Sequence, residues 1–253
     1  MSIIKNKRKR LQIALPELPL SIEEALNRLR INVKFCGKDT KKILVTSSVP
    51  NEGKSFVSVQ LWRLLAEAGS KTVIVDLDIR NSMTSKRLEI KCIDNEGNET
   101  EEPVEGIDYY LSGQIEYDDV VYKTNIENGD FVPCTNLLEN PSSLFEDRRF
   151  EELLTKLASE YRYVILDSPP LVNVADSEQI ATMCDGAIVV VRSGHTSRKL
   201  IRQSLKQLER AGCSLLGMVL NRENNQGKGY GKYGKYGGYG YGYGYGHYGK
   251  NNK

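Results

Sequence analysis

One stretch of this 253-residue chain constrains its fold more than any other, the run from residue 42 to residue 76. Residues 42–47 are mostly apolar without alternation, which is typical of a strand buried on both faces. Residues 55–68 then place apolar side chains at helical spacing, and Gly69 follows as an end signal. A second apolar strand is predicted at 72–76. A strand, a helix and a parallel strand in this order predict a right-handed α/β unit.

Later stretches repeat the alternation of strands and helices. Helices are predicted at 147–158 and 197–210, and a further helix at 21–35 with Ser21 as its N-cap. The predicted strands are 129–133, 163–167, 186–192 and 215–221. This alternation predicts an α/β fold, a parallel sheet with helices on both faces. Residues 90–105 are acidic and polar and are predicted to form a surface loop.

The chain divides into three parts by composition. Residues 1–20 are predicted to be an extended basic arm, residues 21–223 a folded domain, and residues 224–253 a tail. The tail holds eight tyrosines, eleven glycines and five lysines but no acid. Glycine maximises the backbone entropy lost on folding, and no aliphatic side chain offsets that loss, so the tail is predicted to be disordered.

Composition excludes several classes of protein. Apolar residues make up 40% and charged residues 27% of the chain, which is ordinary for a soluble protein. No apolar run approaches the ~18 residues that a membrane span needs. The five cysteines form no C-x-x-C pair and only two histidines occur, so neither a disulfide framework nor a His/Cys metal site is expected. We expect a cytoplasmic protein, with membrane contact only at the periphery.

The loop from Ser48 to Ser55 matches the phosphate-binding pattern G-x-x-x-x-G-K-[ST], except that Ser48 replaces the first glycine. In such loops backbone N–H groups converge on phosphate oxygens. Gly53 would allow close approach, Lys54 would reach the β- and γ-phosphates, and the Ser55 hydroxyl would bind Mg²⁺. The position between a strand and a helix supports this interpretation. The sequence thus predicts a P-loop NTPase-like domain with ATP and Mg²⁺ as its cofactors.

Three aspartates stand at the ends of predicted strands. Asp76 and Asp78 are two residues apart, on one side of an extended segment. Asp167 ends the apolar run that begins at Tyr163, and such a carboxylate holds Mg²⁺ directly or through water. Either strand-end carboxylate alone could simply cap a turn. Because ligands of open α/β sheets bind at the carboxyl ends of the strands, together they predict a nucleotide site.

Three segments together resemble the bacterial protein-tyrosine kinases (BY-kinases) of the CpsD/CapB type, from capsule and exopolysaccharide operons. They are Ser48–Ser55, Asp76–Arg80 and Tyr163–Pro170, and the tyrosine-rich tail adds to the match. The resemblance also covers Gly106–Leu111, Asn140–Ser142, Arg192–Gly194 and Val219–Arg222. It implies a protein-tyrosine kinase without strict substrate specificity, which transfers phosphate from ATP to protein tyrosine.

The resemblance also implies roles for individual residues. The catalytic residues would be Lys54, Asp76, Asp78, Arg80 and Asp167, with Asp76 accepting the tyrosine proton. Nucleotide would contact Ser48, Pro50, Asn51, Glu52, Gly53, Lys54, Ser55, Phe56, Arg192 and Asn221. Metal would bind at Ser55, Asp78 and Asp167. The phosphate acceptors would be Tyr230, Tyr233, Tyr236, Tyr239, Tyr241, Tyr243, Tyr245 and Tyr248.

Partners and location are likewise implied by the resemblance. They are a transmembrane activator of the chain-length-determinant kind, a cognate tyrosine phosphatase and a homo-oligomeric ring, at the inner face of the cell membrane. Ring-forming members carry an E-x-x-R-x-x-R helix. Here Glu24 and Arg30 match, but Asn27 stands where the first arginine belongs.

Two other functions fit parts of the sequence. ATPases of the partition and septum-positioning class share the strand–loop–helix unit, but Val49 occupies the position of their signature lysine. Alternatively, a Tyr/Gly/Lys tail can stack on single-stranded nucleic acid or associate with itself. Both tail functions ignore the adjoining nucleotide site, and nucleic acid is therefore not an expected partner.

Overall fold

The computed structural model describes residues 10–82, 84–94, 96–137, 141–172 and 175–223. The strands are β1 (Arg10–Gln12), β2 (Lys42–Ser47), β3 (Thr72–Asp76), β4 (Lys91–Ile93), β5 (Tyr122–Thr124), β6 (Gly129–Val132), β7 (Tyr163–Asp167), β8 (Gly186–Arg192) and β9 (Leu215–Asn221). The helices are α1 (Leu20–Phe35), α2 (Lys54–Glu67), α3 (Thr84–Arg87), α4 (Ile107–Leu111), α5 (Tyr117–Val120), α6 (Ser142–Phe145), α7 (Arg148–Glu160), α8 (Asp176–Ala181) and α9 (Arg198–Arg210).

All nine strands form one sheet, in the order β4-β1-β5-β6-β3-β7-β2-β8-β9. The six strands from β6 to β9 in that order run parallel, as the sequence predicts. The remaining part is mixed, because β5 is antiparallel to β6 and β4 is antiparallel to β1. Asp76 and Asp167 are direct register partners at the carboxyl ends of β3 and β7. The sheet itself therefore brings two of the predicted carboxylates together.

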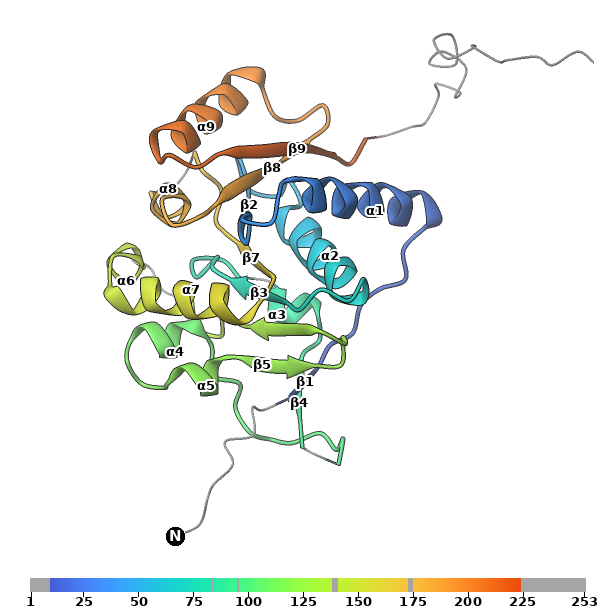
Figure 1. The fold of residues 1–253 in the computed structure, drawn as a ribbon, viewed down its shortest axis with the longest axis vertical. Helices are drawn as coiled ribbons and strands as arrows, with labels where there is room; N and C mark the ends of the chain where they lie inside the picture. The colour runs from blue at the N-terminus through green and yellow to red at the C-terminus, as the bar shows by residue number, and fades with distance from the viewer. Residues whose placement is uncertain (1–9, 83, 95, 138–140, 173–174, 224–253) are drawn as a thin grey trace, which may run out of the picture. The chain divides into compact units, whose positions relative to one another are not determined.

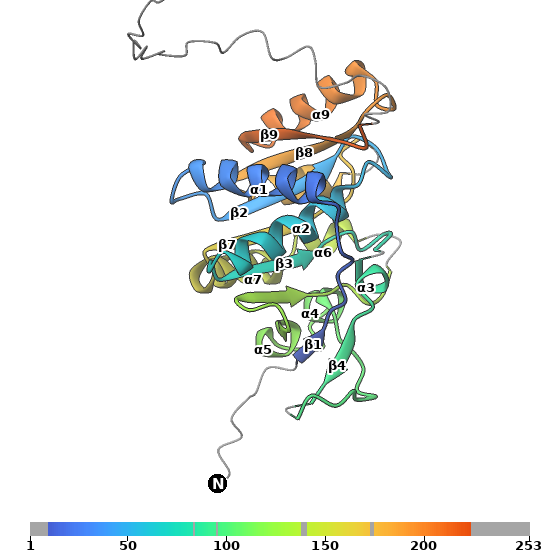
Figure 2. The ribbon, with the colours of Figure 1, turned by 90° about the vertical axis from the view of Figure 1, so that its right-hand side faces the viewer.

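Helices cover both faces of the sheet (Figures 1 and 2). On one face α1 and α2 pack over a core that includes Trp62 and Ile43. The other face carries α7, α8 and α9 over a second core, in which Leu44 lies. Neighbouring residues 43 and 44 enter opposite cores because successive strand side chains point to opposite faces. None of the described helices is long and apolar enough to cross a bilayer.

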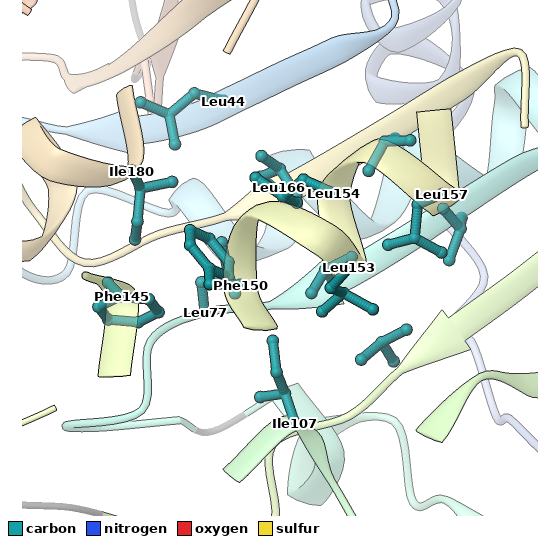
Figure 3. Close-up of a cluster of buried hydrophobic side chains, with 14 of the residues drawn as sticks. Leu44, Leu77, Ile107, Phe145, Phe150, Leu153, Leu154, Leu157, Leu166 and Ile180 are labelled. Carbon is teal, nitrogen blue, oxygen red and sulfur yellow. The ribbon is translucent and has the colours of Figure 1, made fainter. Parts of the chain in front are cut away.

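The helix α7 illustrates how the second core is closed (Figure 3). Its residues Phe150, Leu153, Leu154 and Leu157 share one face and are all buried against the sheet. The helix begins where the Asp147 side chain accepts a hydrogen bond from the N–H group of Arg149, which is the N-cap interaction. This packing fixes the strand β7, whose last residue is Asp167.

Some local predictions need correction. The helix α1 begins at Leu20, and its N-cap is Pro19 rather than Ser21. The Pro19 carbonyl accepts the N–H groups of Ile22 and Glu23, which replaces a side-chain cap. The stretch 90–105 is more than a surface loop, because β4 pairs with β1. Within the extended arm, Leu11 is fully buried, so β1 belongs to the sheet and the core.

Candidate active site

The loop between β2 and α2 has the backbone of a phosphate cradle. Gly53 lies in the left-handed region at φ 96°, just before the first residue of α2. A Cβ atom at this position would lie 2.0 Å from Nδ2 of Asn221, so only glycine fits. The same Nδ2 atom donates to the Glu52 carbonyl at 2.8 Å. The end of β9 thus holds the loop from the side.

Glu52 fastens this loop to the end of β8. Its carboxylate is fully buried and accepts hydrogen bonds from the N–H groups of Val49 at 2.9 Å and Arg192 at 3.0 Å. The hydroxyl of Thr196 donates to the same carboxylate. Ser48, which replaces the usual glycine, is also buried and accepts a hydrogen bond from Ser204 at 2.9 Å. The predicted nucleotide residues Glu52 and Ser48 therefore support the shape of the loop in this structure.

Glu52→Ala is expected to destabilise the fold and weaken ATP binding together. It would leave two buried N–H groups and a hydroxyl unpaired, at about 1–3 kcal/mol for each group that stays unsatisfied. The thermal midpoint should fall by at least about 6 °C, since three such groups cost about 3 kcal/mol or more and 1 kcal/mol corresponds to about 2–4 °C in a domain of this size. Glu67→Ala, an exposed change at the end of α2, is the control. Unchanged melting of the Glu52 variant would contradict the bracing role.

Lys54 and Asp78 form an ion pair inside the site. The Lys54 Nζ atom lies 2.7 Å from the Asp78 carboxylate, and both side chains are largely buried. Burial alone would lower the pKa of Lys54, but the carboxylates of Asp167, Asp78 and Asp76 raise it overall. Lys54 is therefore charged at neutral pH and available to phosphate oxygens.

The two register partners Asp76 and Asp167 are fully buried beneath this ion pair. Burial, with repulsion from Asp167, raises the pKa of Asp76 to about 8, while a hydrogen bond from Ser82 opposes the shift. Burial raises the pKa of Asp167 too, against the effect of Lys54 and the Ser55 and Ser58 hydroxyls. A carboxyl group with a pKa near 8 suits proton transfer near neutral pH.

The donors around Asp167 fit a magnesium ion. The Ser55 hydroxyl is hydrogen-bonded to Asp167, and Ser58 and Thr84 donate to the same carboxylate at 3.1 and 3.3 Å. No three His, Cys, Asp or Glu side chains gather as a metal cluster among the described residues. Mg²⁺ commonly takes one or two carboxylates and completes its shell with phosphate oxygens and water. Ser55 and Asp167, with Asp78 once it is free of Lys54, supply such oxygens.

Arg80 is held at the site by a buried partner. Its Nε atom donates to Oδ2 of Asp176 at 2.6 Å, and the same guanidinium donates to Oδ1 at 3.2 Å. Ser142 donates to Asp176 as well. Burial alone would raise the pKa of Asp176, but the hydrogen bonds from Arg80 and Ser142 lower it overall. This two-point pair fixes the direction of the guanidinium.

A cavity of about 220 Å³ joins these parts. Its walls include the predicted site residues Pro50, Asn51, Gly53, Lys54, Ser55, Asp78 and Arg80, together with Asn81, Arg87, Pro169, Pro170 and Arg222. Asp76 is fully buried and does not line this cavity. Arg192 contributes its backbone N–H group to Glu52, and Phe56 lies on a neighbouring cavity. The predicted acceptor tyrosines lie outside the described residues.

Several residues of the site were missed by sequence reasoning. They are Ser58, Ser82, Thr84, Ser142, Asp176 and Thr196, and all but Ser82 act through a partner distant in the sequence. Serine and threonine are common everywhere in proteins, so they carry no motif of their own. Asp176 follows the Tyr163–Pro170 segment closely. An acidic residue at the start of a helix was the only sequence signal that could have pointed to Asp176.

Comparison with known proteins places the chain in a family. A family model described as an AAA domain matches residues 40–215. The tyrosine-protein kinase CpsD of Streptococcus agalactiae is 34% identical over 215 residues, which cover 85% of this chain and 90% of the relative.

Solved structures agree. The kinase domain of the Escherichia coli tyrosine kinase ETK matches with a TM-score of 0.69 and 25% identity, over 88% of this chain and 80% of that one. A septum site-determining protein MinD from Pyrococcus horikoshii, solved with Mg-ADP, matches with a TM-score of 0.59 and 22% identity, over 73% of this chain and 71% of that one. The second likeness concerns the fold alone. This chain belongs to the bacterial protein-tyrosine kinases of capsule and exopolysaccharide regions, within the AAA-type P-loop family.

Proposed function

We propose that this kinase phosphorylates tyrosines of residues 224–253 on neighbouring copies of itself, and that this reaction regulates capsule or exopolysaccharide synthesis and export. One observation carries the choice of acceptor. Of the fourteen tyrosines, eight lie in residues 224–253, and the six in the folded domain are poorly placed to act as acceptors. Five of the other six are at most 6% exposed, namely Tyr110, Tyr117, Tyr122, Tyr161 and Tyr163, and Tyr109 is half-buried.

The proposed reaction divides the work among the residues of the cavity. The N–H groups of the loop and the Lys54 ammonium hold the β- and γ-phosphates of ATP. Bound Mg²⁺, held through Ser55 and Asp167, would neutralise phosphate charge. Lys54 leaves Asp78 for the phosphates, which frees that carboxylate. Arg80, fixed by Asp176, faces the same cavity.

In the transfer itself, the phenol oxygen forms a bond to the γ-phosphorus. The bond between the γ-phosphorus and the bridging oxygen of ADP breaks, and ADP leaves. The phenol has a pKa near 10, so its proton must be taken up as the bond forms. We assign that proton to the Asp76 carboxylate, because burial raises its pKa to about 8, near the working pH.

Assembly and partners follow as part of the same proposal. The helix α1 exposes Leu20, Ile22, Ile31 and Phe35, and such apolar surface favours association between copies. Within that helix, Arg30 donates a hydrogen bond to Asn27 at 3.2 Å. Asn27, which departs from the E-x-x-R-x-x-R pattern, therefore binds the side chain of the arginine that matches it. A transmembrane activator would hold the kinase at the inner face of the membrane, and a cognate phosphatase would reverse the reaction.

The direct test is to incubate the purified full chain with γ-labelled ATP and Mg²⁺, with and without membranes from its host, and to map phosphotyrosine by mass spectrometry. Phosphate on residues 230–248 is expected. ATP hydrolysis without any phosphate on that stretch would refute the proposal.

Phosphorylation should also change assembly. Eight phosphates would add about −12 to −16 charges to the tail, and repulsion between phosphorylated tails should reduce the size of any assembly.

Ser82→Ala tests the role of Asp76 as the base. The Ser82 hydroxyl lowers the pKa of Asp76, so its loss should raise that pKa further. Activity requires the ionised carboxylate, and the rising limb of the profile of kcat against pH should therefore move to higher pH. A shift of one unit would reduce kcat near pH 7 about tenfold and leave it almost unchanged well above the pKa. Ser85→Ala, whose hydroxyl donates to the Cys134 carbonyl, is the matched control. An equal loss at every pH would rule out this role.

A further inference from the structure

A second cavity, of about 160 Å³, adjoins the cavity of about 220 Å³ beside the Ser48–Ser55 loop, which we call the phosphate cavity. The two cavities share the residues Ser55 and Arg87. The walls of the second cavity are mainly apolar, formed by Leu15, Phe56, Val59 and Leu88. We call it the ring pocket. The proposed reaction uses the phosphate cavity but gives no role to this neighbour.

The walls of the ring pocket come from three segments that are tied together. Val59 is a buried residue of α2, and Leu88 is a buried residue just after α3. Leu15 comes from the segment after β1, where the N–H group of Ala14 donates to the Leu88 carbonyl at 3.0 Å. A benzene molecule is held by an apolar cavity of about 150 Å³. The ring pocket therefore has the size and the lining for one six-membered aromatic ring.

Two of the four polar residues in the wall of the ring pocket, Ser55 and Arg87, also line the phosphate cavity, and the other two are Gln60 and Thr84. Ser55 is the proposed metal ligand, and Thr84 donates to Asp167 at 3.3 Å. Arg87 is exposed and has no ion-pair partner among the residues that the structure describes. A ring with one hydroxyl suits this arrangement, because its apolar body can lie against Val59 and Leu88 while its hydroxyl points to the bound phosphates.

We propose that the ring pocket binds the acceptor tyrosine, supplied by residues 224–253 of a second copy. This inference rests on the proposed function and adds where the acceptor docks. In the tail most tyrosines stand next to glycine, and glycine has no side chain to obstruct entry of the ring. The apolar wall accepts a neutral phenol. It disfavours the phosphorylated product, because burial of a charge away from water is costly, and product release follows.

The test separates ring binding from nucleotide binding in the full-length chain. The acceptor is a synthetic peptide with the sequence of residues 235–248, captured and counted separately from the enzyme. Val59→Phe fills the ring pocket and should raise the KM for this peptide about tenfold, which corresponds to 1.4 kcal/mol of lost binding. The dissociation constant for ATP should stay the same. Leu15→Ser, at a half-buried wall position, should raise the KM several-fold. This second variant keeps the test decisive if the Val59 variant fails to fold.

Two altered peptides sharpen the result. A peptide with every tyrosine changed to phenylalanine should compete with the acceptor peptide, since the ring is what the pocket holds. A peptide with every tyrosine changed to alanine should not compete at a tenfold higher concentration. The phenylalanine peptide can also be titrated by NMR in the presence of a non-hydrolysable ATP analogue, which needs no catalysis. Equal peptide binding by the Val59 variant and the parent would overturn the ring pocket. Weaker ATP binding with unchanged peptide binding would assign the pocket to the nucleotide base instead.

Discussion

Lys54→Met should reduce phosphotyrosine formation about a thousandfold, the upper range for removing one group that stabilises transition-state charge. The ammonium lies among three carboxylates, and no other lysine in the described part of the chain lines the phosphate cavity. Arg80 cannot take its place, because Asp176 holds its guanidinium. The measurement is incorporation of labelled phosphate into the purified chain. Lys71→Met, an exposed lysine stacked on Tyr161, is the control. Labelling at the parental rate would show that another site or another kinase is responsible.

The same substitution should lower stability in a pH-dependent way. Without Lys54, the buried carboxylates of Asp78, Asp76 and Asp167 have lost their shared cation. Protonation of Asp76 and Asp167, whose pKa values are raised, relieves the repulsion, so the loss of thermal midpoint should be larger at pH 8 than at pH 5. The double variant Lys54→Met/Asp78→Asn should recover part of the stability but none of the activity. That outcome would separate the structural effect of the lysine from its catalytic effect.

The parts of the fold that could be predicted are those with a continuous local signal. The strands β7, β8 and β9 have the predicted bounds, because each is an apolar run that is bounded by polar or turn residues. Short elements gave no such signal. The strands β1 and β4 have three residues each and exist because β1 pairs with β4 on one side and with β5 on the other. Tertiary pairing, which no local window contains, decides such segments.

The site shows the same division between local and distant information. The loop and carboxylate motifs predict that Gly53, Lys54, Asp78 and Arg80 share one site, and all four line the same cavity. Motifs could not show that Asp76 is fully buried and does not line that cavity. They also could not show that Arg80 is paired with Asp176, a residue 96 positions away. The resemblance could imply Asp76 as the proton acceptor, but burial and pairing set the pKa values of these groups, so the raised pKa of Asp76 could be inferred only from the structure.

Deletion of residues 224–253 is expected to remove at least about nine-tenths of self-labelling while ATP binding remains. The deletion leaves the described elements and both cavities intact, since all of them lie before residue 224. A full-length chain with all eight tail tyrosines changed to phenylalanine should lose labelling equally, which separates the hydroxyls from the rest of the tail. Phosphate on Tyr109 in the truncated chain would instead make the folded domain its own acceptor.

Mixing two inactive partners then decides how the tail reaches a site. The truncated chain has an intact cavity but no tail, and the Lys54→Met chain has a tail but no working cavity. A chain of thirty residues can extend to about 100 Å at ~3.3 Å per residue, so residues 224–253 are long enough to reach a neighbour. The mixture should therefore label the Lys54→Met chain, and only within residues 230–248. If the mixture stays unlabelled while the parent labels itself at a rate independent of its concentration, transfer occurs within one chain and the proposed exchange between copies is wrong.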